Sequence, residues 1–230
     1  MIQSIQKEYI DIFFIYGFAV CLVVLMPLIS TTLVEKVSTP LVQEIEIKKP
    51  ISGSIFNKNV FSNVVVEGDA YIVYDIIGNE VIASKNQDAI LPLASLTKIM
   101  TAVSSTLHKD KTEKIAISQK SIEDGYDLGL KKNQVWQLGE LLKYTLVFSS
   151  NDGARAVADS FGTRNSFVAQ MNNDAKSLGL GFVFTDPAGL AIGSSVGGLG
   201  NVLDVAKLFA IARNSIPELL DATTKKRATM

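Results

Sequence analysis

Residues 91–102 read Leu-Pro-Leu-Ala-Ser-Leu-Thr-Lys-Ile-Met-Thr-Ala. Ser95 and Lys98 stand three positions apart at the expected start of a helix, where positions i and i+3 share one face. A serine hydroxyl becomes a nucleophile when a base accepts its proton, and a lysine is such a base when its surroundings favour the neutral amine. The spacing makes Ser95 a candidate nucleophile and Lys98 its candidate base. Because Ser-x-x-Lys alone is common, a surface helix with a solvated lysine is the alternative interpretation.

A second pattern lies downstream, where Ser149-x-Asn151 stands just before a run typical of a helix. Ser-x-x-Lys followed by Ser-x-Asn is the combination found at the acyl-transfer sites of penicillin-binding proteins and class A β-lactamases. Serine and asparagine are also favoured as helix caps. The alternative is therefore that Ser149 and Asn151 only cap the helix that follows.

With these motifs, the chain resembles the D-alanyl-D-alanine carboxypeptidases, the low-molecular-weight penicillin-binding proteins of serine peptidase family S11, over roughly residues 62–215. The resemblance rests on residues 71–75 with Gly78 and Val81, and on residues 92–102, 138–142, 151–154, 171–180 and 186–190. It implies an α/β (α+β) fold of the serine β-lactamase and penicillin-binding-protein type. We expect an antiparallel sheet with a helical subdomain.

The resemblance also implies roles for four residues. Ser95 would attack the carbonyl of a peptidoglycan stem peptide ending in D-Ala-D-Ala and form an acyl-enzyme, and β-lactam antibiotics would be covalent inhibitors. Lys98 would accept the Ser95 proton, and Ser149 would relay a proton towards the leaving amine. Asn151 would bind the substrate amide or hold Lys98. The alternative of a serine β-lactamase is disfavoured, because no glutamate stands between Asn151 and Glu218 to act as its deacylating base.

We expect no metal, no cofactor and no nucleic-acid partner. The only histidine, His108, and the only cysteine, Cys21, are too few for a zinc site, and we expect His108 to be a surface residue. The formal net charge of −1 gives no sign of the basic patch that nucleic acids require.

The third motif of the family, Lys-Thr-Gly, does not occur in the 230 residues. In the family it lies further along than this sequence extends, on strands that return to the sheet. We therefore expect a truncated chain without those C-terminal strands. By itself it should be inactive or nearly so, because loss of one oxyanion donor alone lowers the rate by about 10²–10³-fold. A membrane-anchored pseudoenzyme that binds peptidoglycan is the other interpretation.

The N-terminal part predicts a membrane anchor or an uncleaved signal at residues 12–34, which carry no charged side chain and are flanked by Asp11 and Glu35. A helix at about 1.5 Å per residue over that length would cover the ~30 Å hydrocarbon core. A cleaved signal peptide is the rival, but its apolar core is usually shorter. The expected organisation is a tail (1–11), the anchor (12–34), a stem (35–60) and a partial carboxypeptidase domain (61–230) outside the cytoplasm.

The residue pattern of that domain predicts strands and then a helical block. We expect strands at 64–66, 70–77 and 80–84, helices at 95–107, 140–148, 152–161, 166–178 and 202–214, and a glycine-rich loop at 193–200.

Overall fold

The computed structural model describes residue 61 and residues 63–122, 129–191, 193 and 195–225. The expected anchor at residues 12–34 and the stem at 35–60 lie outside these ranges. Within the ranges that it describes, no helix is both long and apolar enough to cross a membrane.

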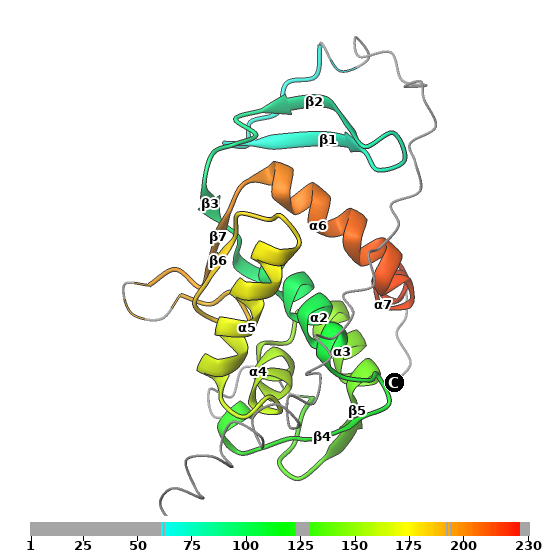
Figure 1. Cartoon of the computed structure of the whole chain (residues 1–230), viewed down its shortest axis with the longest axis vertical. Coiled ribbons are helices and arrows are strands. Elements are labelled where there is room, and N and C mark those ends of the chain that lie inside the picture. The colour runs from blue at the N-terminus through cyan, green and yellow to red at the C-terminus, as the bar shows by residue number, and fades with distance from the viewer. Residues whose placement is uncertain (1–60, 62, 123–128, 192, 194, 226–230) are drawn as a thin grey trace, which may run out of the picture. The chain divides into compact units, whose positions relative to one another are not determined.

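The described part is a mixed α/β fold (Figure 1). Its elements are β1 (Tyr71–Asp75), β2 (Glu80–Lys85), β3 (Leu91–Pro92), the 3-10 helix η2 (Ala94–Leu96), α2 (Thr97–His108), β4 (Lys114–Ala116), the 3-10 helix η3 (Lys120–Ile122), β5 (Val135–Gln137), α3 (Leu138–Val147), α4 (Asn151–Asp159), α5 (Arg164–Ser177), β6 (Val183–Phe184), β7 (Gly198–Gly200), α6 (Val202–Ser215) and α7 (Pro217–Thr223). The strands pair antiparallel, as β1 with β2, β4 with β5, and β3–β7–β6 with β7 in the middle.

The strands predicted at 70–77 and 80–84 are confirmed as β1 and β2, which form a hairpin whose turn places Asn79 at φ 53°. The predicted strand at residues 64–66 is wrong, because these valines form no strand and Val65 is 90% exposed. β-branched residues stabilise a strand only where a partner strand and a buried face are present. Among the described residues nothing pairs with this segment.

The predicted glycine-rich loop is also partly wrong, because its last three residues form β7 between β3 and β6. A Cβ at Gly198 would lie 2.5 Å from Thr97 Oγ1, and a Cβ at Gly200 would lie 2.3 Å from the Phe182 ring. These glycines therefore permit close packing of a strand against its neighbours.

Helix α2 is the central element, because it contacts α3, α4, α5 and α6 (Figure 1). All of its residues from Thr97 to Ser105 are buried, although several are polar. Two hydroxyls of its second half are satisfied inside the helix, since Ser105 Oγ donates to Thr101 O (2.8 Å) and Thr106 Oγ1 donates to Ala102 O (3.0 Å). The surrounding core includes Met100, Val103, Leu141, Leu142, Val157, Phe167, Met171 and Leu208.

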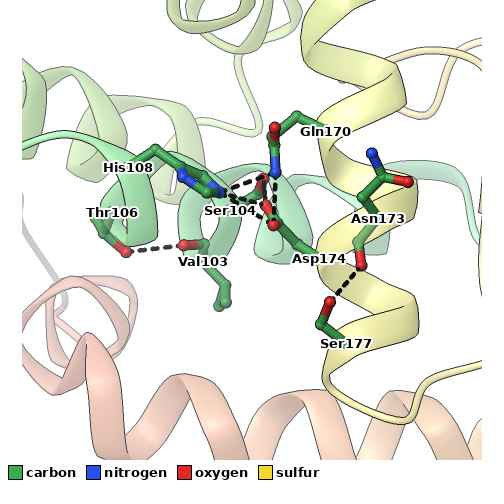
Figure 2. Close-up of polar contacts among 8 residues, drawn as sticks. All are labelled: Val103, Ser104, Thr106, His108, Gln170, Asn173, Asp174 and Ser177. Carbon is green, nitrogen blue, oxygen red and sulfur yellow. Dashed lines mark hydrogen bonds and ion pairs between the residues drawn. The ribbon is translucent and has the colours of Figure 1, made fainter. Parts of the chain in front are cut away.

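A polar cluster ties the C-terminal half of α2 to α5, as Figure 2 shows. The buried carboxylate of Asp174 accepts hydrogen bonds from Ser104 Oγ and from Gln170 Nε2, the latter at 2.8 Å. His108 is exposed, as expected, yet its Nε2 lies 3.0 Å from Asp174 Oδ1. The cluster pairs the buried Ser104 hydroxyl with the buried Asp174 carboxylate and so joins α2 to α5.

Candidate active site

Ser95 and Lys98 come together at the start of α2. Ser95 lies in η2 and is exposed, whereas Lys98 lies in the first turn of α2 and is 2% exposed. Lys98 Nζ donates to Ser95 Oγ at 3.0 Å. The alternative interpretation, a surface helix with a solvated lysine, is therefore wrong. Burial of an amine disfavours its charged form, so this location suits a proton acceptor.

Ser149 reaches the same point from the junction of α3 and α4. Its Oγ donates to Ser95 Oγ at 3.0 Å, and Lys98 Nζ lies 3.4 Å from Ser149 Oγ, a long contact for a hydrogen bond. The two hydroxyls and the amine thus form a closed triangle contributed by segments more than fifty positions apart in sequence. The sequence motifs predicted these residues, and the fold brings them together.

The backbone of Ser149 is in the left-handed region, with φ +53°. It follows Phe148, the C-cap of α3, and this helix ends in a Schellman-type turn in which Ser150 N–H donates to Thr145 O at 3.0 Å. Glycine usually occupies this position, as Gly179 does after α5 with φ +71°. A serine held there is strained, and such strain is concentrated at functional sites.

The alternative that Ser149 and Asn151 only cap α4 is wrong. The N-cap is Ser150, whose Oγ accepts from Gly153 N at 2.7 Å. Asn151 is the first residue of α4 and is half-buried.

A backbone carbonyl also contacts the lysine. Lys98 Nζ donates to Ala188 O at 3.1 Å, inside the loop that precedes β7. Residues 186–190 are part of the family resemblance, but their sequence does not identify this carbonyl. The turn sequence Asp-Pro-Ala-Gly-Leu indicates a tight turn at this place. Gly189 takes φ +79°, and a Cβ there would lie 1.9 Å from Ala94 O.

The site opens into a cavity of about 410 Å³. Its polar lining includes Ser95, Lys98 and Ser149, and its apolar lining includes Leu96, Ile99, Leu146, Phe209 and Leu220. Hydroxyls in contact with a buried amine can pass a proton among them, and the exposed Ser95 can meet a carbonyl that enters the cavity. No group of three or more His, Cys, Asp or Glu that could hold a metal ion is found in the part of the chain that the structure describes.

Comparison with known proteins agrees with this geometry. The sequence model of the D-alanyl-D-alanine carboxypeptidase family, peptidase family S11, matches residues 57–230. A D-alanyl-D-alanine endopeptidase of Haemophilus influenzae is 35% identical over 63% of this chain and 50% of its own length. An Escherichia coli D-alanyl-D-alanine endopeptidase is 33% identical over 72% of this chain and 54% of its own length. The chain thus spans about half the length of the curated relatives it matches.

Solved structures share the fold. The crystal structure of a D-alanyl-D-alanine carboxypeptidase from Mycobacterium tuberculosis aligns with a TM-score of 0.64 and 26% identity, covering 70% of this chain and 61% of the other. Penicillin-binding protein D2 of Listeria monocytogenes in its cefotaxime-bound form aligns with a TM-score of 0.63 and 26% identity, covering 73% of this chain and 70% of the other. The expected α/β fold of the penicillin-binding-protein type is confirmed, and the chain belongs to the D-alanyl-D-alanine carboxypeptidase family of serine peptidases.

Proposed function

We propose that the protein is a serine peptidase that cleaves the D-Ala-D-Ala bond of peptidoglycan stem peptides through an acyl-enzyme at Ser95. The observation that carries the proposal is the triangle of Ser95 Oγ, Lys98 Nζ and Ser149 Oγ, with edges of 3.0, 3.0 and 3.4 Å. This triangle occurs in a member of the D-alanyl-D-alanine carboxypeptidase family.

The proposed reaction begins when the Ser95 hydroxyl proton passes to the neutral amine of Lys98 as Oγ bonds to the carbonyl carbon of the penultimate D-Ala. The Ser95 backbone N–H stabilises the negative oxygen of the tetrahedral intermediate. Collapse breaks the C–N bond, and the leaving amine takes the proton from Lys98 through the Ser149 hydroxyl. Water then hydrolyses the Ser95 ester by the reverse proton path, and Asn151 at the start of α4 binds the substrate amide or holds Lys98.

The leaving group distinguishes two activities within this proposal. Release of a free terminal D-alanine is carboxypeptidase activity, and cleavage of a cross-link at the same acyl position is endopeptidase activity. Relatives named for each activity match this chain. We propose carboxypeptidase activity, and cleavage of a cross-linked stem-peptide dimer without release of D-alanine from the monomer would reassign it.

β-lactam antibiotics are the proposed covalent inhibitors, and relatives with cefotaxime and ampicillin bound support this assignment. We further propose that residues 12–34 anchor the protein in the cell membrane with the catalytic domain outside the cytoplasm. The uncharged apolar run and the location of a cell-wall substrate support this topology. Protease treatment of intact spheroplasts should degrade the domain while a cytoplasmic marker stays intact, and a protected domain would contradict the topology.

The decisive test uses the protein expressed from its complete open reading frame. A fluorescent penicillin should label the wild type at Ser95, located by peptide mass spectrometry, and a D-Ala-D-Ala peptide should release D-alanine. Ser95→Ala should abolish both signals, whereas Ser177→Ala, which removes an exposed serine on α5, should leave both unchanged. Label on a serine other than Ser95 would overturn the proposal, and sustained cephalosporin turnover would indicate a β-lactamase.

A further inference from the structure

We propose that Asp186 is a positioning residue for the Lys98 amine, acting through the Ala188 carbonyl. This inference rests on the proposed function of Ser95 and Lys98. Asp186 is 0% exposed, and its Oδ1 accepts hydrogen bonds from Ala188 N at 2.8 Å and from Leu190 N at 3.1 Å. Ala188 is therefore held on both sides, because its N–H donates to Asp186 and its carbonyl accepts from Lys98.

We call the two hydrogen bonds that Asp186 Oδ1 accepts from residues 188 and 190 the clamp. Within the described residues, the unpaired second oxygen of Asp186 points to positioning rather than to simple loop closure. Asp186 Oδ2 is buried and has no hydrogen-bond partner among the residues that the structure describes. A buried acceptor without a partner is costly, so its retention needs a reason. The reason we infer is that Asp186 Oδ1 accepts from two backbone N–H groups and thereby fixes residues 188–190, with the Ala188 carbonyl directed at Lys98.

Other bonds attach the same loop to the fold without touching Ala188. Thr101 Oγ1, one turn beyond Lys98 on α2, donates to Pro187 O at 2.6 Å, and Asp186 N donates to Gly197 O at 3.1 Å. Loss of the Asp186 carboxylate would therefore leave the loop attached at its start. The N–H groups of Ala188 and Leu190, which lie on either side of the Ala188–Gly189 peptide that carries the carbonyl, would lose their acceptor.

The consequence for catalysis follows from the geometry of Lys98. The amine contacts the hydroxyls of Ser95 and Ser149 and the carbonyl of Ala188, and this carbonyl belongs to neither motif. If that acceptor turns away, the amine gains freedom relative to Ser95 Oγ. A misplacement on the order of 1 Å at a reacting group lowers rates by about 10²-fold. Asp186 touches no atom of the proposed substrate, so the loss should appear in kcat, or in the acylation rate constant, with KM unchanged.

The test compares Asp186→Ala with Asp186→Asn in the protein from the complete open reading frame. The asparagine amide oxygen can accept both N–H bonds, so Asp186→Asn should retain nearly wild-type kcat, whereas Asp186→Ala should lose about 10²-fold. Thr163→Ala removes the N-cap of α5 and controls for general destabilisation, and it should lower the melting temperature without this loss of kcat. Crystal structures of both Asp186 variants provide a readout that does not depend on activity.

The outcomes separate this inference from the proposed function. Absence of Ser95 labelling in the wild type would remove the proposed function. The clamp would then be judged by the Lys98 Nζ–Ala188 O and Lys98 Nζ–Ser95 Oγ separations, which should widen in Asp186→Ala and not in Asp186→Asn. Wild-type kcat and unchanged separations in a folded Asp186→Ala would overturn the clamp. A loss in Asp186→Asn equal to that in Asp186→Ala would do so as well, because the acceptor would not then be the relevant feature.

Should Asp186→Ala fail to fold, Asp186→Ser decides the question. Its shorter hydroxyl can reach the N–H of Ala188 two positions on but not that of Leu190. We expect kcat between those of the wild type and of a variant with no acceptor, with KM unchanged. Wild-type kcat in Asp186→Ser would overturn the proposal.

Discussion

Replacing Ser149 by glycine should make the protein more stable and much less active. Ser149 holds φ +53° at a helix C-terminus where glycine is usual, and its hydroxyl contacts Ser95. A left-handed conformation costs a non-glycine residue about 1–2 kcal/mol, and the greater freedom of glycine in the unfolded chain offsets about 0.5–1 kcal/mol of that relief. Ser149→Ala keeps the strain and removes the same hydroxyl, so it is the matched control.

The two variants separate backbone strain from the chemistry of the hydroxyl. Ser149→Gly should exceed Ser149→Ala in free energy of unfolding by about 0.5–1 kcal/mol. In a domain of this size that corresponds to a melting temperature higher by about 1–4 °C, measured by calorimetry. Both should lose acylation of Ser95 by penicillin by about 10²–10⁴-fold, the usual contribution of a positioned proton-transfer group. Equal melting temperatures would refute the strain argument, and wild-type acylation in either variant would refute the proton relay.

Three further perturbations test contacts that stabilise the fold. Gly189→Ala should lower the free energy of unfolding by about 2–4 kcal/mol in urea titrations, because its Cβ would lie 1.9 Å from a carbonyl oxygen. The control Gly179→Ala, whose Cβ would have nothing within 4 Å, should cost only about 1 kcal/mol. Equal costs for the two variants would contradict the clash. Asp174→Ala should cost about 1–3 kcal/mol, since it leaves a buried serine hydroxyl of α2 without its acceptor, and a loss below 0.5 kcal/mol (about the size of a neutral surface change) would show that the cluster carries little stability. The hydrogen bond from Lys111 lowers the pKa of Glu218, so the pair stabilises the fold above the unfolded pKa and that stabilisation is lost as pH falls through the folded pKa. Both side chains are substantially exposed, so Lys111→Gln should cost only about 0.2–1 kcal/mol at pH 7 and progressively less as the pH falls through the folded pKa of Glu218, and a larger cost in acid would reverse the assigned sign.

Local sequence patterns were sufficient wherever the determining interactions are themselves local. The hairpin at Tyr71–Lys85 and the helix beginning near Ser95 were predicted within a few residues, because turn residues and helical periodicity act over one or two turns of chain. Helix α7 and the central strand β7 were not predicted. Short apolar or glycine-rich segments take the conformation that their neighbours impose, and those neighbours lie far away in sequence.

The candidate site divides in the same way. Side-chain chemistry and i, i+3 spacing determine that Ser95 and Lys98 can meet on one helix, and the second motif supplies Ser149. The acceptor at Ala188 O carries no side-chain signature, because every residue has a carbonyl and only the path of the loop aims one at Lys98. The sequence by itself thus determined the candidate reacting groups and the family resemblance. The tertiary structure decided which of two neighbouring serines caps a helix and which contacts Ser95, because backbone conformation, rather than residue type, directs an otherwise identical hydroxyl.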